Sequence, residues 1–373
     1  MTEQETLYTI ALSLTPHLKT KAQRQLLEAF GSATAVYENR LNPAAVLPKA
    51  SRSAKEALAT LDKQLKRAEQ ELAFINRYHI RALSIRDDAY PARLKDCPDA
   101  PIILFCKGNA DLNTPYVISM VGTRKATPYG KKLCQDFVAE LKDLCPHVLI
   151  ISGLAYGIDI HSHRAALNNQ IPTVAILAHG LDTIYPASHR DDALRMMENG
   201  ALLTEFVSRT NADKKNFIVR NRIIAGMADA IVVVESGEKG GALITAQFAS
   251  DYNRDVFVFP GRTTDQYSIG CNRLASQNKA AIILSAHDLI DDMGWQRRLK
   301  TMDADETIQR ELFPELNPEE QQIVNLLKTS GAMPINSIAE KLGKPVSLVL
   351  SLLVNLEIKG VTESIPGGKH KLL

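Results

Sequence analysis

The sequence predicts an α/β protein whose core is a doubly wound, mostly parallel sheet. From about residue 100 onward, short runs rich in β-branched residues alternate with stretches of helical character. These runs are apolar enough to be buried on both faces, which indicates parallel strands covered by helices on both sides. The chain has 373 residues, 45% hydrophobic and 23% charged, a composition that excludes a disordered or collagenous protein. This length predicts two or three modules.

The first module, residues 1–80, is predicted to be a helical domain. Its apolar residues recur at helical spacing, as in Leu58, Leu61, Leu65, Leu72 and Ile75. No convincing alternation of apolar and polar residues indicates a strand in this part of the sequence. We therefore place the helical domain at residues 1–80 and the core at residues 81–295.

The core is predicted to alternate strands and helices. The expected strands are Tyr116–Val121, Val148–Ser152, Thr173–Leu177, Ala201–Thr204, Ile231–Glu235, Val256–Pro260 and Ile282–Leu284. The expected helices are Tyr129–Leu144, Asp159–Asn168, Ala193–Glu198, Asn221–Met227 and Leu243–Tyr252. In such sheets ligands bind at the carboxyl ends of the strands, so a site is expected in the loops that follow them.

A polar, charge-rich stretch, residues 296–314, is typical of a linker to a third module at residues 315–373. Asn317 and Pro318 are typical of a helix start. The elements that follow are expected to be two further helices, Ile335–Leu342 and Pro345–Ile358, and a hairpin made of Val361–Ile365, the turn 366–368 and Lys369–Leu373. Three helices followed by a β-ribbon predict a winged-helix domain.

The charge balance and the cysteines exclude several classes of protein. The formal net charge is only +2, so a nucleic-acid partner would need a local concentration of basic residues. The five cysteines form no C-x-x-C pair, which favours free thiols and argues against zinc. The acidic amino terminus and the lack of about 20 uninterrupted apolar residues predict a cytoplasmic protein without a membrane span.

The loop Val121–Arg124 directly follows the first strand predicted in the core and precedes a helix. Gly122 would let backbone N–H groups approach a phosphate, and the helix N-terminus would add positive potential. Arg124 would supply a bidentate phosphate contact. The alternative is a turn glycine beside a solvated arginine, and this short motif alone leaves both interpretations open.

The next strand ends in a similar loop, Ser152–Asp159, which contains two glycines four residues apart. A hydroxyl group, these glycines and a helix start would form a compact backbone nest for an anion. We interpret Asp159 as a helix cap rather than a catalytic acid. His161 and His163 would point about 200° apart on a helix, so they cannot chelate one metal ion. A structural His163 that faces the sheet is favoured.

The densest signal is Lys214–Arg222, where four cations and Phe217 occur within nine residues. Such a segment combines neutralisation of phosphates with a ring on which a base can stack. The alternative is that Phe217 belongs to the core and that the cations are a solvated helix start. We favour the functional interpretation, because Ile223 and Ile224 would bury one side of the segment and direct its cations along the other.

A further strand-loop-helix junction, Glu235–Thr245, contains the adjacent Gly240 and Gly241. It carries neither the dinucleotide nor the triphosphate fingerprint. No Ser/His/Asp order, glycine-flanked nucleophile or paired carboxylates indicate catalysis. We therefore expect a site that holds phosphate without transforming it, with no cofactor and no metal.

Together these motifs resemble the bacterial DNA-processing protein A family, DprA or Smf. The motifs that carry the resemblance occur in order over about 150 residues: Val121–Arg124, Ser152–Asp159 with His163, Ala166-Leu167, Gly180–Asp182, Tyr185-Pro186, Glu205, Phe217, Arg220–Gly226, Gly241–Ala246, Pro260-Gly261 and Gly270–Asn272. The flanks are similar too, since members commonly carry an N-terminal helical, SAM-like domain and a C-terminal winged helix.

The resemblance implies an extended Rossmann-like core in a protein that is not an enzyme. It implies binding of single-stranded DNA without sequence specificity, a homodimer, and loading of RecA recombinase onto strands taken up during natural transformation (competence). With the loops described above, the candidate DNA-binding residues are Gly122, Thr123, Arg124, Ser152, Gly153, Tyr156, Gly157, Lys214, Lys215, Phe217, Arg220, Asn221, Arg222, Gly240 and Gly241.

The chain departs from the family pattern at three places. Tyr156 stands where many members have Lys or Arg, and its ring could stack on a base instead. Leu14–His17 stands where members often show a glycine hairpin, which weakens a DNA role for the first module. The usual Gly-Ala ending is altered near residues 277–280.

Two other classes of protein are alternatives. A Rossmann-type nucleotide or phosphoribosyl hydrolase of the lysine-decarboxylase-like group would carry Pro-Gly-Gly-x-Gly-Thr, whereas this chain has Lys239–Ala242 without the Gly-Thr. A transcription regulator is suggested by the winged helix, but residues 315–373 contain six Lys and six Glu with no Arg or Asp. Because this module is neutral and its third helix is apolar, a role in protein contacts is favoured over duplex reading.

Overall fold

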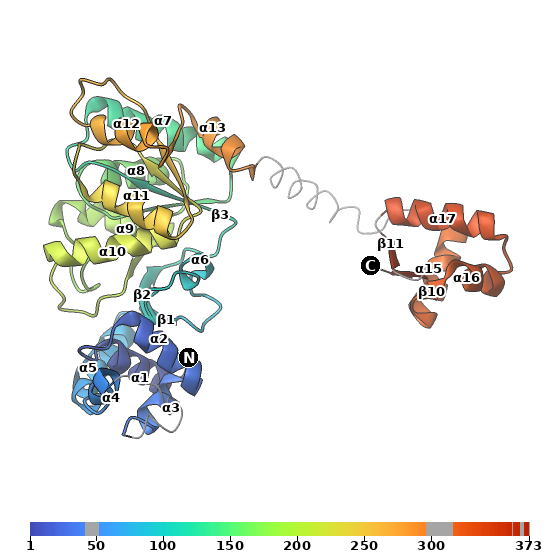
Figure 1. The fold of residues 1–373 in the computed structure, drawn as a ribbon, viewed down its shortest axis with the longest axis horizontal. Helices are drawn as coiled ribbons and strands as arrows, with labels where there is room; N and C mark the ends of the chain where they lie inside the picture. The colour runs from blue at the N-terminus through green and yellow to red at the C-terminus, as the bar shows by residue number, and fades with distance from the viewer. Residues whose placement is uncertain (42–51, 296–315, 360, 366–368, 373) are drawn as a thin grey trace. The chain divides into compact units, whose positions relative to one another are not determined.

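The computed structural model describes residues 1–41, 52–295, 316–359, 361–365 and 369–372 (Figure 1). They belong to two compact units, residues 1–293 and 294–373. The predicted linker, residues 296–314, and the predicted turn at 366–368 lie outside the described residues. The first unit holds both the N-terminal helices and the sheet, so the boundary at residue 80 stays a prediction. None of the helices in the described ranges is both long and apolar enough to span a membrane.

Helices alone form the beginning of the first unit, as the sequence predicts. Before the sheet the described residues form α1 (Glu3–Ser13), α2 (Thr20–Phe30), α3 (Ala33–Glu38), α4 (Arg52–Leu58) and α5 (Asp62–Arg77). Leu58, Leu61 and Ile75 are buried, and Leu65 and Leu72 pack against the same core. That core continues into the sheet, so the helices and the sheet share one apolar interior.

The sheet of the first unit orders its strands β1-β2-β6-β5-β4-β3-β7-β8-β9. Their bounds are β1 (Arg81–Ser84), β2 (Ile103–Gly108), β3 (Tyr116–Val121), β4 (Val148–Ser152), β5 (Thr173–Ile176), β6 (Gly200–Thr204), β7 (Ala230–Val233), β8 (Asp255–Val258) and β9 (Ala281–Ile282). Every pairing from β6 to β9 in this order is parallel. Strand β2 pairs antiparallel with β1 and with β6. The predicted mostly parallel sheet is therefore confirmed.

Helices cover the sheet in two groups. α7 (Pro128–Leu144), α8 (Ile158–Asn168) and α9 (Arg190–Glu198) pack side by side, and so do α10 (Lys214–Gly226) and α11 (Gly241–Asp251). The chain runs from β3 outward to β6 and then returns to β7 beside β3, so right-handed crossovers place the two groups on opposite faces. The remaining helices are α6 (Ala92–Lys95), η2 (Ala187–His189), α12 (Ile269–Ser276) and α13 (Ala286–Asp292).

The seven predicted strands are confirmed: Tyr116–Val121 and Val148–Ser152 match at both ends, and the ends of the others differ by at most two residues. The sequence analysis missed β1 and β2, which form the antiparallel edge of the sheet. It was also wrong about where α10 begins. This helix starts at Lys214 rather than Asn221, so the basic segment is helical and does not precede the helix.

In its described residues the second unit has three helices and a ribbon, the predicted winged-helix arrangement, with β10 as a third strand that the sequence analysis missed. Its described elements are α15 (Pro318–Ser330), β10 (Met333–Pro334), α16 (Ile335–Leu342), α17 (Val346–Ile358), β11 (Thr362–Ile365) and β12 (Lys369–Leu372), with sheet order β10-β12-β11. Asn317 caps α15 in a capping box with Glu320, and Pro318 occupies the first turn, as expected. The core includes Ile323, Ile338, Val349 and Leu353.

Candidate nucleic-acid interface

A pocket of about 760 Å³ lies where the order of the parallel strands reverses. Strand β3 pairs with β4 on one side and with β7 on the other, so the loops after β3 and β7 lead away in opposite directions. Such a crevice is where open α/β sheets bind ligands. The lining comes mainly from these two loops, from α10 and from the start of α11. Nine of the predicted residues line it: Gly122, Thr123, Arg124, Lys214, Phe217, Arg220, Asn221, Gly240 and Gly241.

The loop after β3 is held tightly at its base and exposed at its tip. The backbone N–H of Thr123 donates to the carbonyl of Glu235 over 2.8 Å, which joins the loop to the end of β7. A Cβ on Gly122 would lie 2.4 Å from Ile158 and 2.8 Å from the Glu235 carbonyl oxygen, so only glycine fits. Arg124 follows directly and is exposed. A rigid turn thus presents a free guanidinium at the rim of the pocket.

Glu235 has a supporting role that the sequence analysis did not assign. Its buried carboxylate accepts the backbone N–H of Thr127 over 2.9 Å and the hydroxyl of Thr127 over 2.5 Å. Thr127 in turn caps α7 by accepting the N–H of Gly130. The carboxylate therefore fixes both the loop after β3 and the start of the next helix.

The loop after β4 lines the pocket through Ala155, whereas its predicted residues Ser152, Gly153 and Gly157 support the pocket from outside the lining. Ser152 is buried and donates to the carbonyl of Met120 over 2.6 Å. Gly157 has a φ of 79°, and a Cβ there would lie 2.1 Å from the carbonyl oxygen of Thr123. Gly153 packs so closely that a Cβ would be 2.3 Å from a guanidinium nitrogen of Arg220. These three predicted residues shape the neighbouring loop and helix.

Asp159 does not cap α8, which corrects the sequence interpretation. The N-cap position is Gly157, and Asp159 lies inside the first turn, where it accepts the N–H of Ala155 over 3.4 Å. It is buried among the groups that enclose Gly153, with the guanidinium of Arg220 beside it. Burial raises the pKa of Asp159, and the positive charge of Arg220 opposes that rise. The carboxylate therefore belongs to a buried charge cluster under the pocket.

Helix α10 provides the aromatic wall of the pocket. The ring of Phe217 is half-buried, and the guanidinium carbons of Arg124 and Arg220 lie 5.1 and 5.8 Å from its centre. The ring of Tyr185, 49% exposed, lies 5.9 Å away at an interplanar angle of 59°. Lys214 is exposed one turn before Phe217. Cations and a ring therefore meet in the manner expected for a site that holds phosphates and stacks a base.

The structure buries both arginines of the Arg-Asn-Arg motif, whereas the sequence analysis expected their side chains along the exposed side of the segment. Arg220 is 3% exposed, donates to the backbone carbonyl of Ile176, and burial lowers its pKa to about 10. Arg222 is 7% exposed, does not line the pocket, and forms an ion pair with Glu205. Because its charge is buried and paired, Arg222 is not available to a phosphate.

Two more predicted residues lie outside the pocket. Lys215 is exposed on the side of α10 that does not line it. Tyr156 is 49% exposed and its ring contacts His189 edge-on, with 5.0 Å between the ring centres. Asn221 remains in the lining, where its amide donates to the carbonyl of Gly241 over 3.3 Å.

The start of α11 adds a phosphate-binding element. Gly240 and Gly241 form its N-cap and first residue, and no side chain caps the helix. The free N–H groups and the positive end of the dipole therefore face the pocket. Lys239 beside them and Lys125 beside Arg124 are exposed lining residues that the sequence analysis missed. Lys125 follows Arg124 and Lys239 precedes Gly240, so a basic residue next to a predicted binding residue was the signal that could have identified both.

The buried histidine and cysteines carry no binding chemistry. His163 is buried and its Nδ1 lies 2.7 Å from the Thr173 hydroxyl, so the predicted structural role is confirmed. Burial lowers its pKa to about 3. All five cysteines are buried and free, and burial raises the pKa of the Cys134 thiol to about 12. In the described ranges no three His, Cys, Asp or Glu side chains gather as a metal site would require.

Comparison with known proteins shows the family of the chain. A family model described as DNA recombination-mediator protein A matches residues 81–294, and one described as the DprA winged helix domain matches residues 311–368. Protein Smf of Escherichia coli is 30% identical over 336 residues, which are 88% of this chain and 87% of that protein.

Two solved structures are similar as well. DNA processing protein A of Streptococcus pneumoniae has a TM-score of 0.64 and 30% identity, covering 78% of this chain and 98% of that one. DNA processing protein A of Helicobacter pylori, described in its single-stranded DNA binding mode, has a TM-score of 0.53 and 27% identity, covering 59% and 97%. Since the first family model spans more than half of the sequence, the chain belongs to the DNA recombination-mediator protein A family, DprA or Smf.

Proposed function

We propose that this protein binds single-stranded DNA without sequence specificity in the pocket between β3 and β7. The observation that carries the proposal is the half-buried ring of Phe217 in a lining that contains five cations and one carboxylate. The carboxylate, Asp159, is buried beside Arg220, so the charges that face solvent are positive. Arg124, Lys125, Lys214 and Lys239 are the exposed cations among them.

The geometry favours single strands over duplex. A base reaches the ring of Phe217 only when it is unstacked, and bases in a duplex are stacked and paired. The backbone N–H groups at Gly240 and Gly241 and the exposed cations contact phosphates, which carry no sequence information. The description of the Helicobacter pylori relative names single-stranded DNA as its ligand, which supports the same assignment here.

The proposed role is binding without catalysis. The one carboxylate in the pocket lining, Asp159, is buried beside Arg220, so the lining offers no exposed carboxylate as a general base. Asp159 stabilises the buried guanidinium of Arg220 and is thereby committed to the framework. Turnover of nucleoside monophosphates by the purified chain would contradict this part of the proposal.

We further propose that the protein acts as a homodimer and loads RecA recombinase onto single strands during natural transformation. This rests on membership of the family and on the resemblance of the motifs. Light scattering of the purified chain tests the dimer. Faster onset of RecA ATP hydrolysis on single strands coated with single-strand-binding protein tests the loading, and an unchanged onset would contradict it.

The decisive experiment is a titration with labelled single strands of mixed sequence and with duplex of equal length, at several salt concentrations. We expect tighter binding of single strands, with log K falling against log salt by about 0.7 for each neutralised phosphate. Arg124→Ala is expected to weaken this binding by about 1.5–3 kcal/mol, because a charge-assisted contact is lost.

Arg195→Ala is the matched control, because Arg195 is an exposed arginine on α9 outside the pocket lining. It should bind as the unaltered chain does. Equal or tighter binding of duplex would contradict the proposed preference. Unchanged affinity of a folded Arg124→Ala variant would return Arg124 to the interpretation as a solvated arginine.

A further inference from the structure

The segment 205–213 connects β6 to α10 and therefore determines where α10 begins. The N-cap residue, Asp213, makes no side-chain hydrogen bond to the helix. The first turn of α10 is therefore not stabilised by a capping side chain, as helix starts usually are. Its first turns carry Lys214 and Phe217, so the placement of these two residues depends on how the preceding segment is held.

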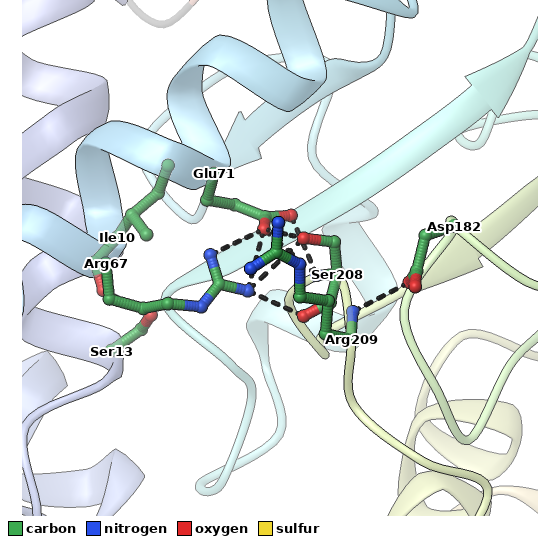
Figure 2. A network of polar contacts seen from close by, with 7 residues as sticks. All are labelled: Ile10, Ser13, Arg67, Glu71, Asp182, Ser208 and Arg209. Atoms are coloured by element: carbon green, nitrogen blue, oxygen red, sulfur yellow. Dashed lines mark hydrogen bonds and ion pairs between the residues drawn. The ribbon is translucent and has the colours of Figure 1, made fainter.

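The segment is held by the helical part of the first unit, as Figure 2 shows. Glu71 on α5 is 2% exposed, and its carboxylate accepts the N–H of Ser208 over 2.9 Å and the Ser208 hydroxyl over 2.5 Å. Arg67, one turn earlier on α5, donates to the carbonyl of Ser208 over 2.6 Å and to Glu71 over 3.0 Å. The backbone N–H and C=O of one loop residue are therefore both bonded to α5.

The next residue is constrained as well. Arg209 has a φ of 60°, in the left-handed region that costs a non-glycine residue about 1–2 kcal/mol. Its N–H donates to the carboxylate of Asp182 over 2.9 Å (Figure 2). Asp182 belongs to the loop that also carries Tyr185, whose ring contacts Phe217. Arg209 thus follows a residue that is bonded to α5, and is itself bonded to the loop that carries Tyr185.

We propose that Glu71 is a positioning residue for the DNA pocket, acting through Ser208 on the start of α10. The inference rests on the proposed function and assigns the helical part of the first unit a role in it. Glu71 does not line the pocket, so any effect on binding passes through other residues. Its contacts select one conformation of segment 205–213 and so present Lys214 and Phe217 at the correct place.

The test compares variants of the full chain by titration with a labelled oligothymidylate and by amide hydrogen exchange. Glu71→Ala is expected to weaken binding of the single strand about fivefold or more, the scale of a typical coupling between sites. Exchange should quicken in residues 206–218. Glu71→Gln keeps an acceptor oxygen for the Ser208 N–H, so it should restore part of the affinity, and it replaces Glu71→Ala if that variant does not fold.

Arg24→Ala is the matched control. Arg24 on α2 also joins the helices to the rest of the unit, by donating to the carbonyls of Lys95 and Cys97, but it does not contact segment 205–213. It should bind the oligonucleotide normally. Normal binding by Glu71→Ala, or an equal loss in Arg24→Ala, would overturn the inference while leaving the proposed function intact. Failure of the unaltered chain to bind would refute the proposed function itself.

Discussion

At the scale of single residues, three adjacent side chains of one motif have three different tasks. Arg220 lines the pocket as a buried cation, Asn221 lines it with its amide bonded to Gly241, and Arg222 is paired with Glu205 on another side of α10. A cation in a sequence motif therefore need not be a cation on the binding surface. The accessible positive charge comes instead from exposed residues on three separate loops or helix starts, such as Lys125, Lys214 and Lys239.

Phe217 is the residue whose substitution separates stacking from packing. Phe217→Ala is expected to weaken binding of single strands by about 1–3 kcal/mol, because one base loses its stacking partner. The melting temperature should change little, since the ring is only half-buried. Phe217→Trp should bind well, because an open wall accepts a larger ring. A Phe217→Ala variant that melts early yet binds normally while folded would show that the stacking assignment is wrong.

His163 predicts a pH dependence of stability. Its pKa is about 3 in the fold and about 6.5 in an unfolded chain. Between these values the unfolded chain binds a proton that the folded one excludes, so stability falls as pH drops below about 6.5, by up to about 1.4 kcal/mol per pH unit. His163→Gln should be less stable at pH 7, where it loses the native contact with Thr173, but should lose less on acidification. Equal slopes in thermal melts from pH 7 to 5 would contradict this role.

At the scale of elements, the pocket is made by one face of α10 and by loops at the ends of parallel strands. Lys214, Phe217 and Asn221 are spaced three and four residues apart, so they share a face of the helix. Lys215 and Arg222 are seven apart and share another side, which explains why neither lines the pocket. Ala155 of the β4 loop lines the pocket, and Gly157 of the same loop takes part indirectly, by packing against the β3 loop.

Gly157 tests that indirect role. Gly157→Ala forces a Cβ to within 2.1 Å of the Thr123 carbonyl oxygen at a φ of 79°. We expect a loss of about 1–3 kcal/mol in stability and weaker binding of single strands, because the peptide before Arg124 must move. Gly237→Ala is the control for stability, since the nearest atom to its Cβ would be 3.7 Å away. A Gly157→Ala variant that melts and binds as the unaltered chain does would contradict this explanation.

At the scale of the whole molecule, the proposed DNA site lies within the first unit alone. Its lining runs from Val121 to Tyr267. The second unit has a complete core of its own and is electrically neutral over residues 315–373, with six Lys and six Glu. Its helix α17 exposes Val346, Leu350 and Val354 at four-residue intervals, a surface that is apolar rather than basic.

A chain that ends at residue 295 is therefore expected to bind single strands with the affinity of the full chain. The physical reason is that every charge and ring of the proposed site remains in place. Side-by-side titration of the two proteins is the measurement, and thermal melting confirms that the shortened chain folds. A marked loss of affinity, or a duplex footprint by residues 315–373, would show that the second unit contacts DNA.

The sequence by itself determined the parallel-sheet architecture and the location of the candidate site in the loops after the strands. Runs such as Val148–Ser152 are apolar at every position but the last, and only a sheet buried on both faces accommodates them. Ligands bind at the carboxyl ends of parallel strands, so the site was expected in the loops that follow them, and Gly122 and Gly240 in two of these loops both line the pocket. The start of α15 could also be predicted, because Asn317 is a preferred N-cap residue and Pro318 suits the first helical position.

Only the tertiary structure decided which residues of the site face a ligand. Arg222 is not available to a ligand, because its guanidinium forms an ion pair with Glu205, which precedes α10 in a separate segment. Arg220 is buried because Gly153 of the β4 loop and Asp159 of α8 lie against its guanidinium. Tyr185 enters the pocket from a loop 32 residues before Phe217 in the numbering. These outcomes depend on contacts between segments distant in the sequence, and burial together with charge pairing, not residue type, sets whether a cation is free to bind.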